Sequence, residues 1–142
     1  MSAARAATAV AATAATAAAV LLAGCGAESA DLFAVQRSGA DRNANVRLIV
    51  NDGGTVTCNR GKPKALPGKA LLQARELARD LEAQAQLSID LPPASNSILR
   101  YVVRTPAGRV AFSDTSAGRP KSFDRLAGFT KDVVEDVCGI AR

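Results

Sequence analysis

The sequence predicts an α+β domain: a mostly antiparallel sheet of about five strands, with two helices packed on one of its faces. Short segments in which apolar and polar residues alternate are typical of strands, and two longer segments with apolar residues every three or four positions are typical of helices. Their order is β-β-β-α-β-β-α. Two helices that cover the same face bury both of their apolar stripes, so we expect two layers.

Three short strands are expected first, over residues 32–37, 45–51 and 55–58. Their inward positions alternate along the chain and are apolar at Phe33, Val35, Val46, Leu48 and Val50. Asp52, Gly53 and Gly54 separate the second and third strands, and Asp and Gly tolerate the positive φ angles of a hairpin turn. These strands are therefore expected to form a meander.

A helix over residues 66–86 is the clearest element in the sequence. Its apolar positions recur every three or four residues, and Pro67 suits the first turn of a helix. Residues 87–97 contain Pro92 and Pro93, which end the helix and favour an extended connector that crosses the molecule.

A second strand pair and a last helix complete the expected domain. Residues 98–105 and 109–114 alternate in polarity around a Pro106-Ala107-Gly108 turn, as a hairpin does. Ser122 is a suitable N-cap for the last helix, with Asp124 in its first turn. Tyr101, Val103, Val110 and Phe112 are expected to point inward from the hairpin.

The first 24 residues have the layout of a signal peptide. They carry a single charge, at Arg5, followed by an alanine-rich apolar segment and small residues before Cys25. Leu22-Ala23-Gly24-Cys25 resembles the lipobox of bacterial lipoproteins. That resemblance implies that Cys25 becomes the N-terminus and carries the lipid, which would anchor the protein on the extracytoplasmic face of the cell membrane.

Two other interpretations of this segment are a membrane-spanning anchor and a secreted protein with a chance cysteine. The apolar run of about 17 residues is shorter than the ~20 that a spanning helix needs, and alanine is weakly apolar. We therefore expect a lipoprotein signal peptide over residues 1–24, a lipidated N-terminus with a short tether over residues 25–31, and a single domain over residues 32–142.

With Cys25 assigned to lipid, Cys58 and Cys138 remain as an even pair. An oxidising compartment favours a disulfide between them. The alternative is a pair of free or redox-active thiols. Redox pairs usually lie close together as Cys-x-x-Cys, whereas these two are far apart in the sequence. We expect a structural disulfide.

The composition excludes several classes of function. The 142 residues contain no histidine, which removes Ser-His-Asp and Cys-His nucleophiles and histidine-ligated metal sites. No catalytic constellation can be assembled from the spacing; Asp52 and Asp114 are better explained by turn geometry and loop hydrogen bonds. We expect no enzyme activity, no cofactor and no metal. Few aromatic residues and an external location disfavour a nucleic-acid partner.

Three arginines are the candidate partner-binding residues: Arg47, Arg100 and Arg104. Each alternates with inward apolar residues, so each is expected on the sheet face that the helices leave uncovered. Loss of Arg5 with residues 1–24 leaves 17 basic and 13 acidic residues, a net charge of +4. Such a face suits an anionic partner, and the competing interpretation is an ordinary solvated sheet face.

The body of the chain is similar in layout to the emfourin-like protease inhibitors. The residues that carry the similarity are Phe-Ala-Val-Gln-Arg-Ser-Gly at 33–39, Tyr-Val-Val-Arg at 101–104 and Gly-Arg-Val-Ala-Phe-Ser-Asp at 108–114, together with the two helices. This similarity implies inhibition of a thermolysin-type zinc peptidase. The chain departs from the pattern around Val56, at its cysteine pair and at its lipid anchor, and no inhibitory residues can be matched.

The expected function is therefore that of a lipid-anchored, non-enzymatic envelope protein with a small binding domain. Its partners are the membrane, through the lipid on Cys25, and an unidentified envelope protein, peptidase or anionic polymer. The alternative is a tethered inhibitor of a secreted thermolysin-type metallopeptidase.

Overall fold

The structure is a computed structural model that describes residues 29–141. Its strands are β1 (Asp31–Gly39), β2 (Val46–Asn51), β3 (Thr55–Cys58), β4 (Lys64–Ala65), β5 (Leu99–Thr105) and β6 (Gly108–Ser113). Its helices are α1 (Gly68–Gln86) and α2 (Lys121–Asp132), and α2 continues into the π-helical turn η1 (Val133–Val137).

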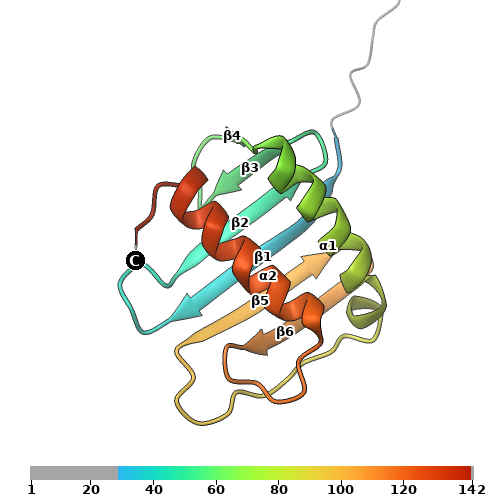
Figure 1. The fold of residues 1–142 in the computed structure, drawn as a ribbon, viewed down its shortest axis with the longest axis vertical. Coiled ribbons are helices and arrows are strands. Elements are labelled where there is room, and N and C mark those ends of the chain that lie inside the picture. The colour runs from blue at the N-terminus through green and yellow to red at the C-terminus, as the bar shows by residue number, and fades with distance from the viewer. Residues whose placement is uncertain (1–28, 142) are drawn as a thin grey trace, which may run out of the picture.

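The six strands form one antiparallel sheet in the order β4-β3-β2-β1-β5-β6. The first strand is therefore central, between β2 and β5. Both helices lie across the same face of the sheet (Figure 1). The predicted α+β class, the order of elements and the two layers are confirmed, and β4 adds a sixth strand to the five expected.

The core lies between the sheet and the helices, where the inward residues of the strands meet the apolar stripe of each helix. Every aromatic side chain of the protein is buried there. The ring of Phe112 stacks between Tyr101 and Phe123, with centroid distances of 5.0 and 4.7 Å, and Phe33 meets Phe129 edge-on at 5.9 Å. Such pairs stabilise a core beyond the area they bury.

The first helix begins at Gly68, two residues later than expected, and Pro67 is its N-cap residue with an extended ψ of 143° instead of a member of the first turn. Its buried residues are Ala74, Leu77, Leu81 and Ala85, which share one face. At its end the helix lies directly on the β5–β6 turn. A Cβ built on Gly108 would lie 2.2 Å from the Ala85 carbonyl oxygen, so only glycine fits this contact.

The expected N-cap at Ser122 is wrong. The second helix begins at Lys121, with Pro120 as its N-cap residue, and Ser122 is buried inside the first turn. The ψ angle of Pro120 is 150°, which is extended and not helical. Pro120 therefore still belongs to the preceding loop, and the helix starts at the next residue. The proline therefore decides where the helix begins.

The predicted disulfide between Cys58 and Cys138 is present, with the two Cα atoms 5.9 Å apart. It joins β3 to the residue that follows η1. Beside it, the Lys64 ammonium donates hydrogen bonds to the Val137 and Cys138 carbonyls at 3.1 and 3.2 Å. These contacts hold the end of the last helix against the β3–β4 edge of the sheet.

The predicted signal peptide and Cys25 lie outside the described residues. Asp31, which the sequence assigns to the tether, is the first residue of β1. Ala30, just before it, accepts a hydrogen bond from the Asp52 amide at 2.9 Å. Within residues 29–141, no helix is long and apolar enough to span a membrane.

Candidate functional site

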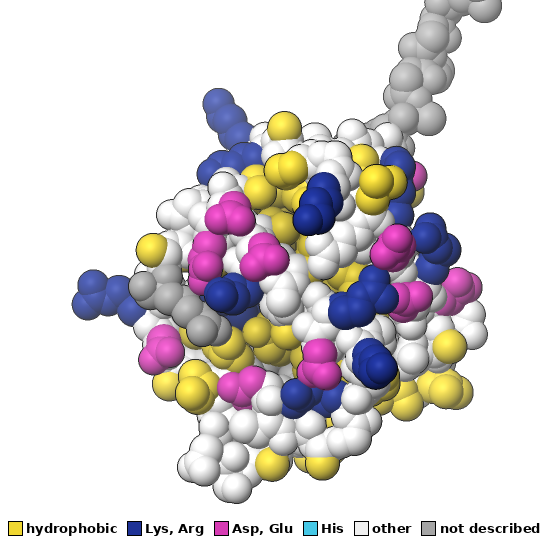
Figure 2. Space-filling model, in the orientation of Figure 1, with side chains coloured by type: hydrophobic (Ala, Val, Ile, Leu, Met, Phe, Trp, Pro, Cys, Tyr) yellow, Lys and Arg dark blue, Asp and Glu magenta, His cyan; other side chains and the backbone are white. Residues whose placement is uncertain are grey.

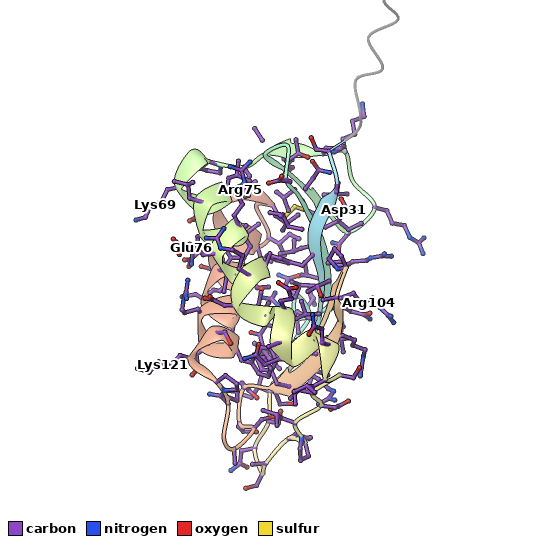
Figure 3. All side chains as sticks on the ribbon, turned by 90° about the vertical axis from the view of Figure 1, so that its right-hand side faces the viewer. Asp31, Lys69, Arg75, Glu76, Arg104 and Lys121 are labelled. Carbon is purple, nitrogen blue, oxygen red and sulfur yellow. A yellow bond between two sulfur atoms is a disulfide. The ribbon has the colours of Figure 1, made fainter. Side chains whose placement is uncertain are left out.

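The sheet has one face that the helices do not cover, and we call it the open face. The side chains of Arg47, Arg100 and Arg104 belong to it, because each alternates with buried neighbours on its strand. Figure 3 shows Arg104 on the side of the sheet opposite Lys69 and Lys121 of the helices. The expected position of the three arginines is therefore observed.

Two of these arginines line one hollow across the central strand. Gln36 of β1 is paired with Arg47 of β2 and with Val102 of β5, and Ala34 is paired with Arg104. All five residues line a shallow hollow of about 270 Å³. The side-chain amide of Gln36 and the two guanidinium groups thus lie around the apolar side chains of Ala34 and Val102.

Arg47 and Arg104 are both exposed, and neither forms an ion pair with any described residue. A guanidinium group presents a planar fork of donors that matches the oxygen atoms of a phosphate or carboxylate. With both forks unoccupied by acidic side chains, the hollow is suited to an anionic ligand.

Arg100 is in a different position from the other two. Its guanidinium lies 2.7 Å from a carboxylate oxygen of Asp90, and the other oxygen of Asp90 lies 3.3 Å from Arg109. The hydrogen bond from Arg100 is the main cause that holds the pKa of Asp90 below its usual value, against a partial desolvation that raises it. This triad joins β5, β6 and the connector that follows α1.

The connector reaches this position because it runs along the outer edge of β6. The Ala111 amide donates to the Ile89 carbonyl, and the Leu91 amide donates to the Ala111 carbonyl, both at 2.9 Å. Asp90 lies between these two bonds and forms a parallel bridge with Ala111. The extended connector predicted from Pro92 and Pro93 is thus also an added edge of the sheet.

Charge is distributed unequally between the two layers. The open face carries four arginines, Arg47, Arg100, Arg104 and Arg109, against the single carboxylate of Asp90, a net charge of +3. The helices α1, α2 and η1 carry seven acidic and six basic residues, a net charge of −1. On the helix side both signs are interspersed (Figure 2). An anionic partner is therefore attracted to the open face.

Sequence reasoning missed Arg109 and Asp90. The strand pattern that places Val110 inward already places Arg109 outward, so the signal for Arg109 was available. No local signal identifies Asp90, because its role depends on the path of the connector.

The two acidic residues considered for catalysis have structural partners. Asp52, in the β2–β3 turn, pairs with Arg75 of α1 at 2.6 Å. Asp114 accepts hydrogen bonds from the backbone amides of Ile98 and Leu99. These contacts agree with the turn and loop roles expected for both. Within residues 29–141 there is no group of three acidic or cysteine side chains placed to hold a metal ion.

A larger cavity lies elsewhere, a groove of about 730 Å³ between α1, the start of β1 and the β5–β6 turn. Its lining mixes apolar residues with Asp31, Asp52, Arg75, Arg79 and Glu82. Because both signs of charge alternate along it, the groove does not select an anion or a cation.

Comparisons of the chain with protein families, with curated proteins and with solved structures find no match. The open face and the sequence of the N-terminal segment are therefore the features of the chain that bear on its function.

Proposed function

We propose that this protein is a lipid-anchored, non-enzymatic domain on the extracytoplasmic face of the cell membrane, and that its open face binds an anionic component of the cell envelope. The observation that carries the proposal is the charge of the open face: four guanidinium groups against one carboxylate, beside a helix layer of opposite net charge. Phosphate and carboxylate groups are the ligand chemistry that such a face favours.

An anionic ligand suits this surface better than a hydrophobic protein partner does. Protein interfaces depend on a few large anchors, most often Trp, Tyr and Arg. The chain contains no tryptophan, and its one tyrosine and four phenylalanines are all in the core. Of the usual anchors, only arginine remains on the open face.

The lipid anchor follows from Leu22-Ala23-Gly24-Cys25, and several acyl chains on Cys25 would hold the domain durably, since each buried methylene contributes ~0.8 kcal/mol. We infer binding rather than catalysis because the chain has no histidine and because Asp52 and Asp114 are engaged in structural hydrogen bonds. The disulfide fits an oxidising compartment.

The test has two parts. The intact mass of the protein extracted from membranes should correspond to a chain that begins at Cys25 and carries acyl groups. The chain from residue 25, made with Cys25→Ser, should bind a soluble phosphate polymer and anionic vesicles, and both interactions should weaken as the salt concentration rises. A full-length, unacylated mass would contradict the anchor, and binding to neither anion would contradict the role of the open face.

The tethered inhibitor of a thermolysin-type metallopeptidase remains a second prediction. It rests on the similarity in sequence layout to the emfourin-like inhibitors. An inhibition assay against a thermolysin-type peptidase tests it directly. Inhibition that persists after Arg47→Ser and Arg104→Ser would separate this activity from anion binding.

A further inference from the structure

We propose that the anionic partner of the open face is the surface of the bilayer in which Cys25 is anchored, so that the domain lies with its sheet against the lipid headgroups and its helices away from them. This inference depends on the lipidation of Cys25 that the proposed function includes. It adds the partner and the orientation of the domain.

The tether is too short to hold the domain far from the membrane. Ser29 and Ala30 are attached to the end of β2 and the β2–β3 turn: the Asn51 side chain donates to the Ser29 carbonyl, and the Asp52 amide donates to the Ala30 carbonyl. Ser29 follows Cys25 by four positions, and four fully extended steps of the chain span about 14 Å. Ser29, two residues before the start of β1, therefore stays within about 14 Å of the anchored cysteine.

The arginines of the hollow are near this point. Ala34, the partner of Arg104, follows Asp31 by three residues, and Gln36, the partner of Arg47, follows it by five. A strand rises about 3.3 Å per residue, so these positions are about 10 and 17 Å along β1. When the sheet lies parallel to the bilayer, both arginines reach the headgroups without any extension of the tether.

Two other orientations bring less favourable charges to an anionic membrane. An upright domain would present the β2–β3 end of the molecule, where Asp31 and Asp52 are exposed. A domain lying on its helices would present a layer with net negative charge. The open face instead presents net positive charge across the sheet, and its central residues Ala34, Ile49 and Val102 are apolar and half-buried.

Weak attraction is sufficient because the anchor has already confined the domain. Each cation near an anionic bilayer contributes about 1 kcal/mol, and a short tether makes the contact intramolecular, at a high effective concentration. The open face therefore does not need a deep pocket to remain on the membrane.

The experiment measures vesicle binding of the chain from residue 25 with Cys25→Ser, so that the lipid does not dominate the result. Vesicles of phosphatidylglycerol and phosphatidylcholine are compared with vesicles of phosphatidylcholine alone. The test variant combines Arg47→Ser with Arg104→Ser. The control combines Arg79→Ser with Lys121→Ser, two exposed cations of the helix layer that form no ion pair with any described residue.

We expect the wild-type chain to bind only the anionic vesicles. The test variant should bind them about thirtyfold more weakly, which corresponds to two cations at about 1 kcal/mol each. The control variant should lose less than threefold. Equal losses in the two variants would show that net charge alone matters and would overturn the assignment of the open face.

Binding to a soluble phosphate polymer distinguishes failure of this inference from failure of the proposed function. A wild-type chain that binds the polymer but not anionic vesicles would overturn the membrane orientation and leave the anion-binding function in place. A chain that binds neither would overturn both. Binding to the two kinds of vesicle with equal affinity would also contradict the inference, because it would not depend on headgroup charge.

Discussion

Arg47 on β2 and Arg104 on β5 line the same hollow on the open face, on opposite sides of β1, and neither pairs with an acidic residue in the part of the chain that the structure describes. Arg100, on the same face, is held by Asp90. The three arginines that the sequence groups together therefore have two different roles. Two are available to a ligand, and one stabilises the edge of the sheet.

Serine substitutions should show, by their effect on the free energy of unfolding, which of these arginines stabilises the fold and which do not. Arg47→Ser and Arg104→Ser should each change the free energy of unfolding by less than about 0.5 kcal/mol, as exposed positions without partners do. Arg100→Ser should lower it by about 0.5–1 kcal/mol, because a partly exposed ion pair is lost. Urea denaturation measures these differences. An equal loss for all three variants would contradict the division.

Asp90→Asn should strengthen anion binding. The substitution removes the one carboxylate of the open face and releases Arg100 and Arg109 for a ligand. If each unit of charge contributes about 1 kcal/mol at a charged surface, affinity for anionic vesicles should rise about fivefold. Asp124→Asn, in the helix layer, is the matched control, since Asp124 also pairs with an arginine, Arg119. The same rise in both variants would show that the position of the charge is irrelevant.

The ion pairs of Asp90 should also make stability depend on pH. Its pKa in the folded protein is below the usual 3.8, chiefly because of the hydrogen bond from Arg100. The stabilisation by these pairs is therefore complete above the unfolded pKa and is lost as the pH falls through the lower folded value. The difference in unfolding free energy between wild type and Asp90→Asn should be present at about pH 6 and should shrink as the pH falls below the unfolded pKa of Asp90.

One outcome of the comparison between wild type and Asp90→Asn would contradict a role for the charge of Asp90. A difference between wild type and Asp90→Asn that persists unchanged in strong acid would mean that Asp90 acts through its size or its backbone rather than its charge. The Ala111 hydrogen bonds of the connector, which involve Ile89 and Leu91 instead of Asp90, should remain in both proteins.

Removal of the disulfide should have the largest effect on stability. Cys58 and Cys138 are 80 residues apart, and closing such a loop restricts the unfolded chain by about 4.5 kcal/mol in the chain-entropy treatment. Cys58→Ser combined with Cys138→Ser should therefore lower the free energy of unfolding by several kcal/mol, measured by urea denaturation of the chain from residue 25. A loss below about 1 kcal/mol would show that the bond does not stabilise the fold.

Alternation along each strand is a local signal, and it was sufficient to predict the order of elements and the side of the sheet on which Arg47, Arg100 and Arg104 lie. It fails where long-range contacts decide the structure. Lys64 and Ala65 form β4 only because they pair with Val56 and Thr55 of β3. Nothing in those two exposed residues is typical of a strand.

Two polar residues show the same limit. Arg37 shares the inward side of β1 with Phe33 and Val35, and it is buried because its guanidinium donates hydrogen bonds to the Asn43 and Ala44 carbonyls of the following loop. Asp90 belongs to the site because the connector returns along β6. Both roles depend on the path of a loop, which local polarity does not predict.

The most direct test of the central claim is a map of the ligand on the protein. Backbone amide shifts of the isotopically labelled chain from residue 25, with Cys25→Ser, would be followed by NMR during titration with nanodiscs that contain phosphatidylglycerol. We predict that the shifts concentrate at Gln36, Arg47 and Arg104 and spare α1 and α2. Shifts confined to the groove between α1 and the β5–β6 turn, with the open face unchanged, would contradict the account.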